Sequence, residues 1–173
     1  MTPTLDIRIQ TADFDLRVEL DRIRTALPGQ IGAVASFVGL VRDQRPPVDH
    51  AALGVDPSAA DPGTDAIDEL LLEHYPGMTE RSMLAMAESA AERWALKAIT
   101  AVHRVGSLKP SDQIVLVVVA SSHRPEAFAA CEYLMDYLKT DAIIWKRERT
   151  RRGTRWLEPT SSDRDRREKW SSH

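Results

Sequence analysis

The sequence has little of what marks several special classes of protein. It contains one cysteine, Cys131, so it can form neither an internal disulfide nor a cysteine-based zinc or iron–sulfur site. Its longest apolar run, Ile114 to Ala120, is far shorter than the ~20 residues of a membrane-spanning helix. The formal net charge of −3 offers no bulk attraction to nucleic acid or to an anionic membrane. We therefore expect no metal, cofactor, nucleic acid or membrane partner.

What is present describes an ordinary soluble domain. Of the 173 residues, 43% are hydrophobic and 28% are charged, which suffices for one core without a disulfide. We predict a single domain over residues 1–160, followed by a charged C-terminal tail over residues 161–173. The lone cysteine, and an N-terminus without a basic and then apolar stretch, predict a cytoplasmic protein.

The spacing of apolar residues predicts the secondary structure. Helical spacing between turn or capping residues predicts helices over residues 11–27, 79–94 and 125–139. β-branched and alternating stretches predict strands over residues 32–41, 69–75, 99–105, 113–120, 143–148 and 154–158, the last two joined as a hairpin. Gly32 and Gly39 indicate a bulge or a close backbone approach in the first strand. We expect an α+β fold with helices packed on one side of a mostly antiparallel sheet.

Residues 43–66 differ in composition from the rest of the chain. They are rich in proline, aspartate, alanine and glycine and show no helical or strand period. This composition predicts a long, mobile surface loop.

A first candidate site lies between a buried strand and a helix, at Ser121-Ser122-His123-Arg124-Pro125. The free N–H groups of a helix start favour an anion, and an arginine fork matches two oxygens of a phosphate or carboxylate. His123 can donate a further hydrogen bond or a proton. The alternative is that Ser122 only caps the helix while His123 and Arg124 are solvated.

A second candidate site is the pair Lys139 and Lys146. Lys139 closes the predicted helix and Lys146 lies on the next strand, so a turn through residues 140–142 can bring both ammonium groups to one rim. Two neighbouring cations lower each other's pKa, which prepares a lysine for proton transfer or nucleophilic attack. The alternative is a lysine that complements the helix dipole and another that guards an edge strand.

A basic block follows at Arg147, Arg149, Arg151, Arg152 and Arg155. With Arg42 and Arg104 it can extend a positive pocket, or it can be a solvated face. Binding of nucleic acid also needs aromatic side chains for base stacking, and only Trp145 and Trp156 are available.

A distance separates the first two candidate sites. From Arg124 to Lys139 there are about fifteen helical steps, or roughly 20 Å, which is more than a compact phosphorylated metabolite can bridge. If both sites serve one small ligand, two copies of the chain must contribute to it. We therefore predict an isologous homodimer with composite sites.

Several ordered blocks resemble the large, catalytic subunit of molybdopterin synthase, over about residues 32–156. They are Phe37-Val38-Gly39 with Val41-Arg42, Leu72 to Thr79 (LEHYPGMT), His103-Arg104-Val105-Gly106, Ser122-His123-Arg124, Met135 to Thr140 (MDYLKT) and Trp145 to Glu148 (WKRE). The resemblance implies a sulfurtransferase of molybdenum cofactor biosynthesis, which converts cyclic pyranopterin monophosphate to molybdopterin by installing two sulfurs as a dithiolene.

The same resemblance implies the partners and the fold. The sulfur would come from a small ubiquitin-like subunit that carries a C-terminal Gly-Gly thiocarboxylate. Two large subunits would form a homodimer, and each would hold one small subunit, giving a heterotetramer. The implied fold is an α/β hammerhead with an added antiparallel subdomain.

Matching positions also imply roles for residues. Lys139 and Lys146 resemble the catalytic lysines, and Arg42, His123 and Arg124 resemble substrate and phosphate ligands. The chain departs from the family at Leu40, where a lysine is frequent, and at Asp43-Gln44, where Asn-His is typical. Thr160 stands where some members carry an arginine, and Arg155 and Arg164 are candidates to replace it.

Two alternative functions follow from the residues themselves. The first is a noncatalytic module that binds anions or RNA through the Arg147–Arg155 block. The second is a phosphate-ester hydrolase that acts without a sulfur donor.

Overall fold

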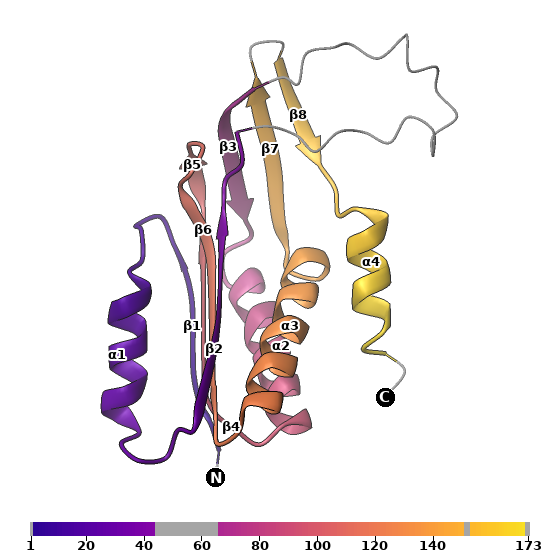
Figure 1. Ribbon diagram of the computed structural model, residues 1–173. Coiled ribbons are helices and arrows are strands. Elements are labelled where there is room, and N and C mark those ends of the chain that lie inside the picture. Colours follow the sequence, from indigo (N-terminus) through magenta and orange to yellow (C-terminus); the bar gives the residue numbers. More distant parts are fainter. Residues whose placement is uncertain (1, 44–65, 151–152, 172–173) are drawn as a thin grey trace.

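The computed structural model describes residues 2–43, 66–150 and 153–171, and these form two four-stranded sheets and four helices (Figure 1). The strands are β1 (Thr4–Gln10), β2 (Ala33–Leu40), β3 (Ile67–His74), β4 (Leu96–Arg104), β5 (Gly106–Leu108), β6 (Gln113–Ser121), β7 (Ile144–Thr150) and β8 (Gly153–Leu157). The helices are α1 (Leu16–Ala26), α2 (Met78–Arg93), α3 (Arg124–Thr140) and α4 (Ser161–Glu168). None of the helices in these ranges is long and apolar enough to cross a membrane.

The predicted α+β fold is confirmed, including the β7–β8 hairpin. Every predicted helix and strand is present, with ends shifted by a few residues. β1, β5 and α4 are additional elements. The predicted loop over residues 43–66 lies outside the described residues apart from its end residues, Asp43 and Ala66. The N–H of Ile67, the first residue of β3, donates to the Asp43 carbonyl at 2.9 Å.

The first sheet has the strand order β1-β4-β6-β2, with β1 parallel to β4 and the other pairs antiparallel. The inner strand β6 is apolar from Ile114 to Ala120 because both of its faces are covered. Val115, Val117 and Val119 pack in one core with α2 and α3, whereas Leu116 and Val118 pack in another with α1. The expectation that helices cover one side only is therefore wrong, since α1 takes the opposite face from α2 and α3.

The second sheet has the order β5-β3-β7-β8 and is antiparallel throughout. It continues beyond one end of the first sheet in Figure 1, above α2 and α3. Its own small core contains Leu70, Leu72 and Leu108. β7 follows α3 after three residues, so this sheet is fixed to the end of that helix.

The two glycines of the first predicted strand have the expected roles. A Cβ atom on Gly32 would lie 2.1 Å from the carbonyl oxygen of Ser122, so only glycine allows β2 to begin beside the end of β6. Gly39 precedes a shift in the β2–β6 register, which is a β-bulge or similar irregularity.

Residues of the predicted charged tail form α4, which packs on α3. The buried carboxylate of Asp136 accepts hydrogen bonds from the Arg166 Nε atom at 3.0 Å and from the Trp170 ring N–H at 2.8 Å. The Trp170 ring lies edge-on to Trp94 and Tyr133, at centroid distances of 5.9 and 5.5 Å. These contacts combine aromatic packing with a charge-assisted bond and attach α4 firmly to the domain.

His103 is a buried titratable group in β4, with 4% of its surface exposed. Burial, with smaller contributions from the charges of Lys146 and His74, lowers the pKa of His103 to about 4, although its hydrogen bond to the Arg104 carbonyl at 2.7 Å acts in the opposite direction. His103 is therefore neutral in the folded protein at neutral pH.

We predict that Trp170→Ala lowers the free energy of unfolding by about 2 kcal/mol, because it removes a half-buried ring and the hydrogen bond to Asp136. Urea denaturation measures this change. The control is Trp156→Ala on the edge strand β8. Trp156 is 53% exposed, so a loss of unfolding free energy below about 0.5 kcal/mol is expected. Equal losses in the two variants would contradict the docking of α4.

We also predict an acid-sensitive contribution of His103 to stability. As the pH falls below 6.5, the unfolded chain takes up a proton at this residue, whereas the folded chain does so only near pH 4. The contribution is complete above pH 6.5 and is lost towards pH 4, by roughly 3 kcal/mol in all. Urea denaturation of the wild type should therefore show a steeper acid dependence than His103→Gln. The exposed His123→Gln is the control, and parallel curves for wild type and His103→Gln would refute the prediction.

Candidate functional site

Lys139 and Lys146 lie at one rim of the molecule, on either side of the short connection between α3 and β7. Lys139 is in the last turn of α3 and is exposed, and Lys146 is half-buried on β7. Burial, and then the positive charge of Lys139, lowers the pKa of Lys146. The charge of Lys139 therefore acts on the protonation of Lys146.

A carboxylate from α4 joins this rim. The Asp163 Oδ1 atom lies 3.3 Å from the Lys139 Nζ atom, and its negative charge raises the pKa of Lys146 against the two effects that lower it. Asp163 was not predicted from the sequence as a site residue. The Thr160-x-x-Asp163 spacing, which resembles a helix capping box, is the pattern that can reveal this helix start.

Two histidines extend the polar cluster towards the interior. The charges of Lys146 and His74 contribute to the low pKa of His103, so the three side chains lie within electrostatic reach. The His74 Nε2 atom is 3.8 Å from the Glu80 Oε1 atom of α2. His103 belongs to a block that resembles the family, yet its neutral, buried state becomes visible only in the structure.

Arg42 follows β2 at the end of the sheet towards which α3 runs. Leu40 pairs with Gln113 at the start of β6, and the Val41 N–H donates to the Asp112 carbonyl at 2.9 Å. The side chain of Arg42 is exposed. It lies towards the same end of the first sheet as Lys139, because α3 returns along the sheet from the end of β6 (Figure 1).

His123 and Arg124 lie at the opposite end of α3 and are both exposed. At ~1.5 Å per residue, Arg124 is roughly 22 Å from Lys139 along the helix. One copy of the chain therefore does not bring these two residues to the lysine pair. The residue at the N-cap is His123 rather than Ser122, and within the described part of the chain no side chain caps the helix by a hydrogen bond. Its first N–H groups thus remain available to an anion.

The basic block is divided among different contacts. Arg149 pairs with Glu69 at 2.8 Å, and the Arg147 guanidinium lies over the Trp156 ring, 5.3 Å from its centroid. Arg151 and Arg152 lie outside the described residues. Arg155 is exposed, and Arg164 is 3.9 Å from Glu158. The described arginines therefore do not form one continuous row of free cations.

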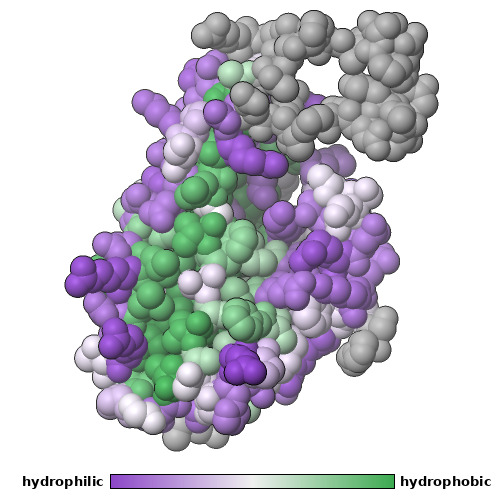
Figure 2. All heavy atoms as spheres, viewed as in Figure 1, coloured by the Kyte–Doolittle hydropathy of each residue, from purple (hydrophilic) through white to green (hydrophobic). Residues whose placement is uncertain are grey.

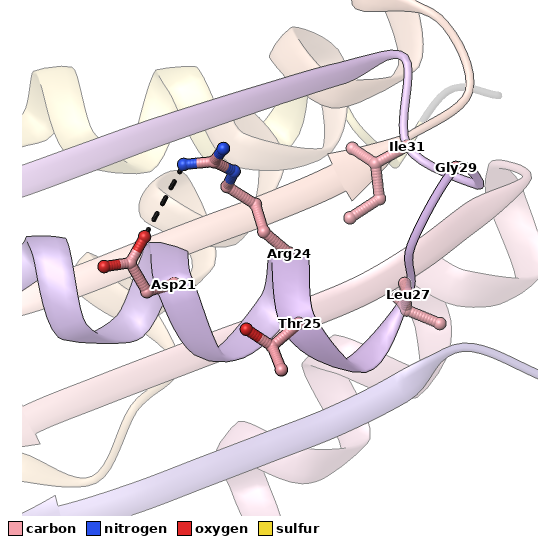
Figure 3. A pocket seen from close by; sticks show the side chains of 6 residues that line it. All are labelled: Asp21, Arg24, Thr25, Leu27, Gly29 and Ile31. Atoms are coloured by element: carbon pink, nitrogen blue, oxygen red, sulfur yellow. Dashed lines mark ion pairs between the residues drawn. The ribbon is translucent and has the colours of Figure 1, made fainter.

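A hollow at the end of α1 lies elsewhere on the molecule. Figure 3 shows it between α1 and the start of β2, lined by Asp21, Arg24, Thr25, Leu27, Gly29 and Ile31. Its arginine is already paired, since Arg24 is 3.5 Å from Asp21. None of the predicted site residues lines it. A hollow whose arginine is already paired is poorly suited to an anionic ligand.

The lysine rim can bind anions and move protons. Lys139 and Lys146 supply fixed positive charge, and the lowered pKa of Lys146 makes proton release easier than from an ordinary lysine. Among the described residues, histidines, cysteines and carboxylates form no cluster of three or more suited to a metal ion. The two lysines suit general acid–base and electrostatic chemistry.

Comparison with known proteins identifies the family. Residues 9–141 match the family model described as MoaE protein. A relative from Ralstonia nicotianae, named molybdopterin synthase catalytic subunit, is 48% identical over 157 residues, which are 91% of this chain and 79% of the relative. A solved MoaE protein from Burkholderia ambifaria has a TM-score of 0.74 and 42% identity over 99% of each chain. A molybdopterin synthase from Staphylococcus aureus has a TM-score of 0.69 and 26% identity, over 87% of this chain and 96% of the other. The chain therefore belongs to the MoaE family.

Proposed function

We propose that the chain is the catalytic subunit of a molybdopterin synthase, an enzyme of molybdenum cofactor biosynthesis that acts in complex with a small subunit. Its reaction is sulfur transfer from a C-terminal thiocarboxylate of the small subunit to cyclic pyranopterin monophosphate, in the cytoplasm. The observation that carries the proposal is the Lys139–Lys146 pair, in which burial and a neighbouring cation lower the pKa of Lys146.

The charges of the reactants explain why such a pair is needed. The thiocarboxylate and the cyclic phosphate are both anions, so they repel each other on approach. Fixed cations in a partly dry pocket offset this repulsion without reorganising during the reaction. Each thiocarboxylate supplies one sulfur, so two small subunits are consumed for each dithiolene.

The two lysines suit different parts of this reaction. Lys139 is exposed at the helix end and acts as acid, base or transient nucleophile while sulfur adds and the phosphate ring opens. Lys146 is more enclosed and holds the thiocarboxylate or stabilises developing negative charge. Arg42, His123 and Arg124 bind the substrate and its phosphate.

A composite site requires a homodimer, and β2 offers the surface for it. β2 is an edge strand of the first sheet. Its apolar side chains Val34, Phe37 and Leu40 are 38%, 41% and 52% exposed. Figure 2 shows apolar side chains gathered along this strand, with hydrophilic residues on both sides. An exposed apolar edge of this kind is typical of an interface.

The direction of β2 and α3 supports a two-fold arrangement. A two-fold axis across β2 sets the two copies of the strand antiparallel, so the Ala33 end of one copy faces the Leu40 end of the other. The start of α3 lies near the Ala33 end, because Ala33 pairs with Ser121. Such a dimer brings His123 and Arg124 of one copy towards Arg42 and the lysines of the other.

The alternative functions are not favoured. An RNA-binding module needs a continuous basic face, whereas Arg147 and Arg149 contact Trp156 and Glu69. The family membership gives no support to a hydrolase without a sulfur donor.

We predict that Lys139→Ala and Lys146→Ala each lower turnover at least about 100-fold, because each removes a group that acts on the reacting atoms. Mass spectrometry of the dithiolene product, after mixing with thiocarboxylated small subunit and cyclic pterin, measures this. Lys109→Ala, an exposed lysine in a turn, is the control and should retain activity. Product formation without the small subunit would favour the hydrolase. Tight binding of RNA that survives Lys139→Ala and falls steeply with salt would favour the binding module.

We predict complementation between two inactive variants, Lys139→Ala and Arg124→Ala. Random exchange of subunits yields mixed dimers in which one of the two sites has both residues intact, so about a quarter of wild-type turnover returns. The matched control mixes Lys139→Ala with Lys146→Ala, which belong to the same copy at each site and should not complement. Absence of recovery in the first mixture, with subunit exchange verified by native mass spectrometry, would contradict the composite site.

A further inference from the structure

Helix α4 brings a carboxylate to the lysine pair from a segment that the sequence predicts as a charged tail. Asp163 lies in the first turn of α4, and its Oδ1 atom is 3.3 Å from the Lys139 Nζ atom. The Asp163 side chain is 19% exposed and that of Lys139 is 52% exposed. The carboxylate is the more enclosed of the two, so it can hold the lysine in place.

Thr160 fixes the orientation of this carboxylate. The Asp163 Oδ2 atom accepts hydrogen bonds from the Thr160 backbone N–H at 3.1 Å and from the Thr160 hydroxyl at 2.7 Å. The Asp163 N–H donates in return to the Thr160 hydroxyl oxygen at 3.2 Å. This reciprocal cap occupies Oδ2 and directs Oδ1 towards Lys139.

Asp163 is ionised in this setting. Burial acts to raise the pKa of Asp163, but the hydrogen bonds from Thr160 and the charge of Lys139 outweigh it and hold the pKa below its usual range. Asp163 therefore carries a negative charge beside the lysines at neutral pH.

The support beneath Asp163 is rigid, because α4 is attached to the helix that ends at Lys139. Arg166 bonds to Asp136 at 3.0 Å and to Glu132 at 2.8 Å. Arg167 bonds to Asp141, immediately after α3, at 3.1 Å. The distance between Asp163 and Lys139 is thus set by two packed helices and not by a flexible tail.

The groups that face Lys146 come from every element around it. Lys139 of α3 lowers its pKa, Asp163 of α4 raises it, and the neutral His103 of β4 lies within electrostatic reach. Its partners in the register on β3 and β8 are the apolar Leu72 and Leu157. Among these groups Asp163 is the one that counters the mutual repulsion of the two lysines.

We propose that Asp163 is a positioning residue of the lysine site, which holds the Lys139 ammonium group beside Lys146 and offsets the mutual repulsion of the two cations. The catalytic consequence rests on the proposed function.

The first test measures lysine protonation and does not depend on activity. The full chain is reductively methylated with a ¹³C label, and each lysine is titrated by NMR, with Lys146→Arg and Lys139→Arg assigning the signals. Asp163→Asn should lower the pKa of Lys146 by about half a unit or more, since it removes the charge that raises it. Asp163→Glu should restore most of the wild-type value.

Two controls separate this effect from simple loss of structure. Asp165→Asn changes an exposed carboxylate of the same helix, for which the described part of the chain gives no hydrogen bond or ion pair, and it should leave the lysine pKa values unchanged. Thr160→Ala weakens the cap but keeps the carboxylate, so its effect should be smaller than that of Asp163→Asn. Unaltered lysine titration in folded Asp163→Asn, or equal shifts in Asp165→Asn, would overturn the proposal.

The second test measures turnover with the small subunit and the pterin. We expect kcat of Asp163→Asn to fall about tenfold at neutral pH, with KM for the pterin changed less than about twofold. The decline of kcat on the basic side of its pH profile should move to lower pH. Unchanged kcat and an unmoved pH profile would overturn the positioning role. If the wild type forms no dithiolene while the NMR shift is present, the proposed function fails and the electrostatic coupling stands.

Discussion

The repulsion between two ammonium groups at one rim is the constraint around which this molecule is organised. Only three residues separate α3 from β7, so the last turn of the helix and the following strand must present Lys139 and Lys146 to nearly the same place. Water would ordinarily separate such cations, because each is better solvated alone. Here the helix is held by the core of the first sheet and the strand by its pairing with β3 and β8, so the backbone positions of the two lysines are fixed relative to each other.

The two sheets and the length of α3 determine how anions can be arranged around that rim. α3 separates the uncapped N–H groups beside Arg124 from the lysines by the full length of the helix. A two-fold dimer across the exposed apolar edge of β2 would bring the start of α3 from one copy towards the lysines of the other copy. In the proposed dimer, the interface and the composite site therefore both follow from the lengths of β2 and α3. α4 adds the Asp163 carboxylate to the lysine pair.

Part of this arrangement could be predicted from the sequence. α3 shows a clear apolar stripe, and its end followed by a short connection and a strand is enough to predict that Lys139 and Lys146 lie near each other. The strand β1 is not among the predicted elements, although Leu5, Ile7 and Ile9 alternate with polar residues as in a strand with one apolar face. α1 was placed on the wrong face, since periodicity indicates that a helix has an apolar side but not which face of a sheet receives it.

The role of the charged C-terminal segment could not be predicted from its composition. A segment containing Asp163, Arg166, Arg167 and Lys169 has the composition of a solvated tail, and its attachment depends on a buried carboxylate, Asp136, some 30 residues earlier in the chain. Local sequence does not reveal such long-range pairs. The same limit applies to His103, whose neutral state results from burial and from the charge of Lys146 on another strand.

The most direct test of the central claim is a crystal structure of the chain with its small subunit and the cyclic pterin bound. The account predicts that the pterin phosphate and the thiocarboxylate end meet at Lys139 and Lys146 of one copy, with His123 and Arg124 contributed by the other copy. A ligand whose contacts come from a single copy, or one seated in the hollow beside α1, would contradict it.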